Sequence, residues 1–178
     1  QAELSQTFAP VYVQLGLHEE AERHYRRAVD FDSESATMRY GLAEALVRKE
    51  HFEEAIDHVL RAIEIMHFYP EAHHLLGIAL TWAKDYPHAI QSFRVAISMR
   101  PGFLDAHRYL ASIHRHLHQV EEAARHREIA VRILNEQGTG VVSIDFLKRN
   151  APLGPQEWAR RMGDSRTDEF ADLAPGVE

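Results

Sequence analysis

A step of 34 residues recurs along this chain of 178 residues. Three series of positions keep their character at every step. Two are alanine throughout: Ala21, Ala55, Ala89 and Ala123, and then Ala28, Ala62, Ala96 and Ala130. The third is large and apolar: Phe8, Leu42, Leu76 and Leu110. A fixed period held over four units without an insertion indicates a helical repeat array, in which each unit packs against its neighbours.

Each unit contains two stretches with apolar residues at helical spacing. Pro70 and Pro101 stand where new units begin, and proline is tolerated in the first turn of a helix. The small residues are explained by close helix crossings, which leave no room for larger side chains. We expect helices at about 3–15, 18–31, 36–49, 52–66, 70–83, 86–99, 104–117 and 120–135.

The third unit carries a known pattern most clearly. It has Leu76-Gly77 three residues after His73, then Ala89-x₃-Phe93, then Pro101, and in these positions the chain resembles the tetratricopeptide repeat family. The resemblance covers residues 2–137. It implies an all-α fold, a right-handed superhelical solenoid of paired antiparallel helices with a C-terminal capping segment. The implied repeats are 2–35, 36–69, 70–103 and 104–137.

Two departures from the family pattern stand out. The usual tryptophan is replaced by polar residues in all four units: Ser5, Arg39, His73 and His107. Arg127 stands where an aromatic residue normally packs against the following helix.

In this family the first helix of each unit lines a concave groove that holds ligand peptides. The resemblance therefore implies a non-catalytic scaffold for protein–protein interaction. The candidate groove residues are Tyr40, Glu44, Arg48, His74, Ile78, Trp82, Arg108, Ser112, Arg115 and His116. Aromatic residues and arginine often anchor interfaces, and arginine binds carboxylates. We expect a protein or peptide partner with an acidic segment.

The sequence contains no constellation typical of catalysis or of a cofactor site. Cysteine is absent, and no phosphate-binding loop or nucleophile motif is found. His114 and His118 have a spacing that can share zinc, but the better interpretation places His107 and His114 between helices. We expect no metal, no cofactor and no catalytic residue. The alternative is that these repeats belong to a larger enzyme, where they recruit substrate or oligomerise.

Charge and hydropathy exclude other partners. Residues 1–69 carry a net charge of −6 and residues 70–137 carry +1, which argues against nucleic acid binding. No run is long and apolar enough for a bilayer, so we expect no membrane partner. We expect a cytoplasmic location.

The remaining residues fall outside the repeats. Residues 138–162 are expected to cap the last helix or to dock, with Phe146 and Trp158 covering it and Asp145 or Glu157 pairing with Arg127. Residues 163–178, with five acids and one arginine, are expected to be a disordered acidic tail. The alternative, that Trp158 and the acidic end are a ligand for a groove in this chain or a neighbour's, leaves self-association through the tail open.

Overall fold

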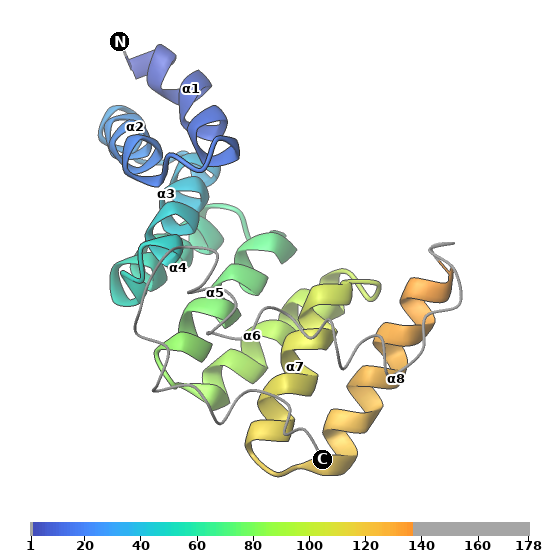
Figure 1. Cartoon of the computed structure of the whole chain (residues 1–178). Coiled ribbons are helices and arrows are strands. Elements are labelled where there is room, and N and C mark those ends of the chain that lie inside the picture. The colour runs from blue at the N-terminus through green and yellow to red at the C-terminus, as the bar shows by residue number, and fades with distance from the viewer. Residues whose placement is uncertain (1, 137–178) are drawn as a thin grey trace. The chain divides into compact units, whose positions relative to one another are not determined.

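A computed structural model describes residues 2–136, and side chains from Thr7 onward except Gln14 (Figure 1). The described residues form eight α-helices and no strand. The helices are α1 (Ala2–Gln14), α2 (His18–Phe31), α3 (Ala36–Arg48), α4 (Phe52–Ile65), α5 (Pro70–Trp82), α6 (Tyr86–Met99), α7 (Leu104–His116) and α8 (Val120–Glu136). None of these described helices combines the length and apolar character of a membrane-spanning segment.

The predicted all-α architecture of paired helices is confirmed, and each helix end lies within one residue of its predicted position. Two helices fall in each of the four predicted repeats. The predicted cap at 138–162 and the predicted acidic tail at 163–178 lie outside the described residues.

The turn between the two helices of a repeat has the same backbone conformation in all four repeats. The left-handed backbone conformation occurs at four positions that are 34 residues apart: Gly16 (φ 73°), Glu50 (φ 62°), Lys84 (φ 62°) and His118 (φ 57°). This conformation reverses the chain after a helix, so that the second helix can fold back against the first. Glycine adopts it without strain, whereas the other three residues carry a Cβ that opposes it.

Capping side chains or a proline favour the starts of α3, α5 and α6. The amide of Met38 donates to the Ser35 hydroxyl at 3.4 Å before α3, and the amide of His88 donates to the Asp85 carboxylate at 3.4 Å before α6. Pro70 is the first residue of α5, where its missing amide proton costs no hydrogen bond.

The chain divides into two compact units, residues 1–101 and residues 102–178. In unit 1, each helix from α1 to α5 packs against the helix that follows it, and α6 is the last helix of the unit. The backbone of α3 also approaches those of α1 and α5, whereas α2 and α4, among the described helices, approach only odd-numbered ones. The odd-numbered helices α1, α3 and α5 therefore form one layer, which we call the inner layer.

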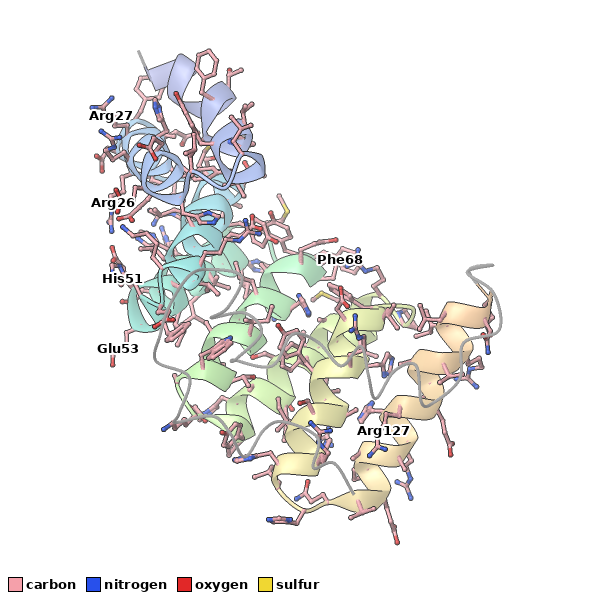
Figure 2. The ribbon with its side chains drawn as sticks, in the orientation of Figure 1. Arg26, Arg27, His51, Glu53, Phe68 and Arg127 are labelled. Atoms are coloured by element: carbon pink, nitrogen blue, oxygen red, sulfur yellow. The ribbon has the colours of Figure 1, made fainter. Side chains whose placement is uncertain are left out.

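Long side chains link α2 with the repeat that follows it. Arg26 pairs with Glu54 of α4 at 2.6 Å and with Glu22 of its own helix at 2.8 Å. Lys49, after α3, pairs with the same Glu22 at 2.8 Å. The Arg26–Glu54 and Lys49–Glu22 pairs join the first two repeats, and Figure 2 shows Arg26 on the outer side of α2.

The repeating alanines lie at the helix crossings of the core. Ala21, Ala55 and Ala89 are completely buried in unit 1, as is Ala123 in unit 2. The ring of Phe93 packs on Gly77, where a Cβ atom would come within 2.8 Å of it. In unit 2, α7 packs against α8 around the buried residues Leu110 and Ala130.

Candidate partner-binding surface

Six of the ten predicted groove residues lie on two neighbouring helices of the inner layer. Tyr40, Glu44 and Arg48 are spaced four residues apart on α3, and His74, Ile78 and Trp82 have the same spacing on α5. Side chains four residues apart share one face of a helix. All six are partly exposed, and α3 contacts α5. We call these six residues the inner face.

The two large aromatic side chains of the inner face are held by other rings. Trp82 stacks on Phe52 of α4, with ring centroids 5.7 Å apart and an interplanar angle of 3°. Tyr40 contacts Tyr69, the residue before α5, at 5.1 Å. A ring fixed in this way loses little conformational entropy on binding, which suits an anchor for a partner.

The two charged residues of the inner face neutralise each other. Arg48 pairs with Glu44 at 2.6 Å, and both side chains are 29% exposed. His18, at the start of α2, lies near this pair, and its pKa is lowered by burial and then by the charge of Arg48. The positive charge expected from Arg48 is therefore largely compensated within unit 1.

The charge of Glu44 acts on three tyrosines. Burial, followed by Glu44, raises the pKa of Tyr25 to about 12, and burial, Glu71 and Glu44 raise that of Tyr69 to about 12. The pKa of Tyr40 is raised by the same kind of environment. These phenols stay protonated at neutral pH. Those of Tyr40 and Tyr69, which are partly exposed, are available as hydrogen-bond donors.

The other two residues of the inner face serve the core as well. The ring of His74 meets Phe93 edge-on at 5.5 Å, and Ile78 packs on the buried cluster of unit 1. Only part of each side chain faces outward.

The remaining four predicted residues belong to unit 2, where all lie on α7. Arg108 pairs with Asp105 at 3.1 Å, and Ser112 and His116 are partly exposed. Burial, followed by the charge of Arg127 on α8, lowers the pKa of Arg115. The predicted set is thus distributed over two units, six residues in one and four in the other.

Sequence reasoning missed the residues that hold the anchors. Phe52 and Tyr69 were absent from the predicted set because they lie at the starts of helices rather than on the presumed groove face. Both are aromatic residues beside predicted helix breaks, and this feature of the sequence could have indicated them.

A cluster of three histidines lies between α7 and α8. His107 Nδ1 is 3.0 Å from His126 Nδ1, and the ring of His114 stacks on that of His126 at 5.7 Å. His107 and His114 are 4% and 3% exposed. One of the two nitrogens in the short contact must accept, so His107 and His126 cannot both be imidazolium ions in this geometry. No group of three potential ligands within the described residues is arranged to hold a metal ion.

Paired helices, buried alanines at a fixed spacing and a recurrent left-handed turn define a helical repeat scaffold in the described residues. The family model described as "Tetratricopeptide repeat" matches residues 7–73. By this match, residues 7–73 are similar to tetratricopeptide repeats, and the described helices have the paired arrangement of that fold.

Solved structures with the same fold include several described as MamA. "Crystal structure of MamA" has a TM-score of 0.74 at 24% identity, covering 78% of this chain and 81% of that one. "MamA 41-end from Desulfovibrio magneticus RS-1" has a TM-score of 0.73 at 15% identity, covering 77% of each chain. At these identities the likeness shows the fold alone. A search of curated proteins found no match.

Proposed function

We propose that the protein is a non-catalytic scaffold that holds a segment of a partner protein against the inner face of unit 1. The observation that carries this proposal is the pair of supported aromatic side chains on adjacent helices. Trp82 rests on Phe52, Tyr40 rests on Tyr69, and all four rings retain partial exposure. Preorganised aromatic side chains of this kind are the usual anchors of protein interfaces.

The proposed partner carries an acidic segment in addition to the residues that contact the aromatic anchors. Because Glu44 compensates Arg48 and Asp105 pairs with Arg108, the attraction for acids comes mainly from Arg115 and His116 of α7. Arginine binds carboxylates through two parallel hydrogen bonds. We place this activity in the cytoplasm as part of the same proposal.

A pull-down from the source cell's lysate, followed by an affinity measurement with the protein recovered, tests the surface. The intact protein is compared with Trp82→Ala/Arg115→Glu, and the matched control is Phe31→Ala/Arg94→Glu. The control removes an aromatic side chain that is 67% exposed at the end of α2 and an exposed arginine on α6. Loss of the partner in the first variant alone supports the proposal, and equal retention in both contradicts it.

Salt dependence separates the acidic segment from the aromatic anchors. Exposed charge pairs are screened over about 8–10 Å at physiological ionic strength. Affinity is therefore expected to fall with salt in the intact protein and to lose much of this dependence in Arg108→Ala/Arg115→Ala. If the affinity changes neither with salt nor with these substitutions, the partner does not bind through an acidic segment. That result would not contradict the proposed role of the aromatic anchors.

A further inference from the structure

Three histidines occupy the interior of the fourth repeat, and we call them the histidine cluster. His107 and His114 lie on α7 and are 4% and 3% exposed, and the partly buried His126 lies on α8. In each of the other three repeats, only one of the equivalent positions holds histidine. The fourth repeat thus has three titratable side chains where the others have one.

The rings of the histidine cluster contact one another across the interface between α7 and α8. The Nδ1 atoms of His107 and His126 are 3.0 Å apart. The ring of His114 stacks on that of His126, with centroids 5.7 Å apart and an interplanar angle of 4°. Both helices belong to unit 2 and pack on each other. The packing of α7 on α8 therefore depends on contacts between rings that can become charged.

These contacts limit the number of protons that the histidine cluster can hold. A hydrogen bond between two Nδ1 atoms has room for one proton, so at most one of His107 and His126 is an imidazolium ion. His114 Nδ1 donates to Gln119 Oε1 at 2.6 Å, and its Nε2 is buried without a hydrogen-bond partner among the described residues. A proton added at this Nε2 would create a buried N–H group without an acceptor. The packed cluster therefore accommodates one positive charge at most.

The charges of α7 and α8 near the histidine cluster do not favour further positive charge. The charged side chains of these two helices that are at least partly buried are Arg108, Arg115, Glu122 and Arg127. Glu122 pairs with Arg125 at 2.9 Å, and on α7 Asp105 pairs with Arg108 at 3.1 Å. Tyr109 adds no negative charge at neutral pH, because burial raises its pKa to about 12, and His116 can add only positive charge. The two carboxylates in these pairs are thus engaged by arginine.

We propose that the histidine cluster is a pH-sensitive switch, which stabilises the packing of α7 on α8 at neutral pH and destabilises it as the pH falls below about 6.5. When the two helices separate, each ring reaches water and can take a proton. The open form of the repeat then binds up to three protons at these rings, whereas the closed form binds one at most. Because the open form binds more protons, the closed form is favoured above this pH and loses its advantage below it.

The difference in bound protons sets the size of the effect. The equilibrium constant for opening changes tenfold per pH unit for each additional proton that the open form binds. A histidine in water has a pKa of about 6.5, so nearly all three rings of the open form are charged at pH 5 and about three-quarters at pH 6. With one proton at most on the closed form, the histidine cluster raises the opening constant by about 50-fold between pH 6 and pH 5. Opening exposes the buried residues Leu110 and Ala130, around which the two helices pack.

The charge states of the three rings in the intact chain test the switch directly. Long-range ¹H–¹⁵N NMR spectra distinguish the two neutral forms of imidazole from the imidazolium ion. In the folded chain we expect a proton on Nδ1 of His114 and a proton on only one of the Nδ1 atoms of His107 and His126. We also expect at most one imidazolium ion in the cluster down to the pH at which α7 and α8 separate. Two imidazolium ions in the folded cluster would overturn the proposal, and this measurement needs no variant that alters the cluster.

Hydrogen exchange at the amides of α7 and α8 measures the opening itself. After correction for the intrinsic pH dependence of exchange, the opening constant of the intact chain should rise between pH 6 and pH 5 by about 50-fold more than that of His107→Asn/His114→Asn/His126→Asn. Asparagine keeps a polar group close to the position of Nδ1 and does not titrate. The matched control is His116→Asn/His118→Asn, which changes two histidines of the same repeat outside the cluster and should keep the pH dependence of the intact chain.

The outcomes separate the switch from a merely structural role of the histidines. A structural role would change the opening constant of the cluster variant equally at both pH values, whereas the switch changes its dependence on pH. Equal pH dependence in the intact chain and the cluster variant, or an equal loss of it in the control, would overturn the proposal. Neither measurement uses a partner protein, so failure of the proposed scaffold function would leave both results unchanged.

Discussion

The phenol ring of Tyr25 occupies the space that a side chain at Gly41 would need. A Cβ atom built on Gly41 overlaps the Cε1 and Cζ atoms of that ring, and Tyr25 is only 5% exposed. One repeat later the same two positions hold Val59 and Leu75, both buried in the same core. The large and small residues have thus exchanged sides between consecutive repeats.

Gly41→Ala is expected to destabilise the protein although alanine is the better helix former. Helix propensity favours alanine by about 1 kcal/mol, but forcing a buried ring out of place typically costs about 1–3 kcal/mol. The free energy of unfolding in urea should therefore fall or, at best, stay unchanged. Gly102→Ala is the control, because no atom lies within 4 Å of a Cβ at that position.

The exchange of large and small residues between these two positions predicts that a second substitution can restore part of the lost stability. Tyr25→Val/Gly41→Leu recreates the pair Val59 and Leu75 in the first repeat, and should be more stable than the sum of the two single substitutions indicates. A double-mutant cycle in urea measures the coupling. Additive effects would show that the two positions do not share one space.

Ala55→Leu and Ala89→Leu are expected to be strongly destabilising. Both alanines are completely buried at helix crossings, and overpacking costs on the order of 1–3 kcal/mol, in some cases more. Ala83→Leu, at an exposed residue after α5, serves as the control. An unchanged melting temperature in the two core variants would contradict the assignment of these alanines to the crossings.

The left-handed turns predict opposite effects for two substitutions at equivalent positions. Gly16→Ala introduces a Cβ at φ 73° with no neighbour within 4 Å, so the loss of about 1–2 kcal/mol comes from the backbone alone. Lys84→Gly relieves that strain and should be neutral or stabilising, because the gain is offset by glycine's greater entropy when unfolded. The melting temperatures of both variants measure these effects. Equal decreases in melting temperature would contradict the prediction that only Gly16→Ala introduces backbone strain.

Stability should fall as the pH drops below about 6.5. Burial lowers the pKa of His18, His58 and His73 from 6.5, aided at His18 by Arg48 and at His58 by Arg39. The unfolded chain then binds more protons than the folded one, so stability is complete above pH 6.5 and is lost as the pH falls through the lower folded pKa values. Urea midpoints at about pH 7.5 and 5 measure the loss. Replacing all three histidines with glutamine should reduce it, whereas replacing the exposed His51 and His67 should not.

A chain ending at Gly138 is expected to melt at a lower temperature and to associate more than the full chain. The reason is the predicted capping of α8 by residues 141–162, in which burial of one aromatic side chain contributes roughly 1.5–3 kcal/mol. Calorimetry and light scattering measure the two effects. If neither changes, Phe146 and Trp158 do not cover the last helix, and Trp158 is better regarded as a ligand for a groove.

The helices could be predicted within one residue because the 34-residue period repeats each boundary signal four times. Pro70, Gly16 and the alanine series act locally or at fixed spacing, and such signals can be read from sequence. The support of Trp82 by Phe52 could not be predicted, because it joins two repeats and depends on how their helices cross. The compensation of Arg48 by Glu44 was predictable from their spacing of four residues, since opposite charges at that spacing face each other on a helix.

The exchanged sizes at the first two repeat junctions determine the order of the repeats. A copy of the third repeat placed directly after the first would bring Leu75 against Tyr25, two large side chains in a space made for one. The Arg26–Glu54 and Lys49–Glu22 ion pairs would be lost in the same rearrangement, because each joins the first repeat to the second. Repeats of equal length and nearly equal helices are therefore not interchangeable here. Shuffled or duplicated versions of this array should fold less stably than the natural order, even though every helix is retained.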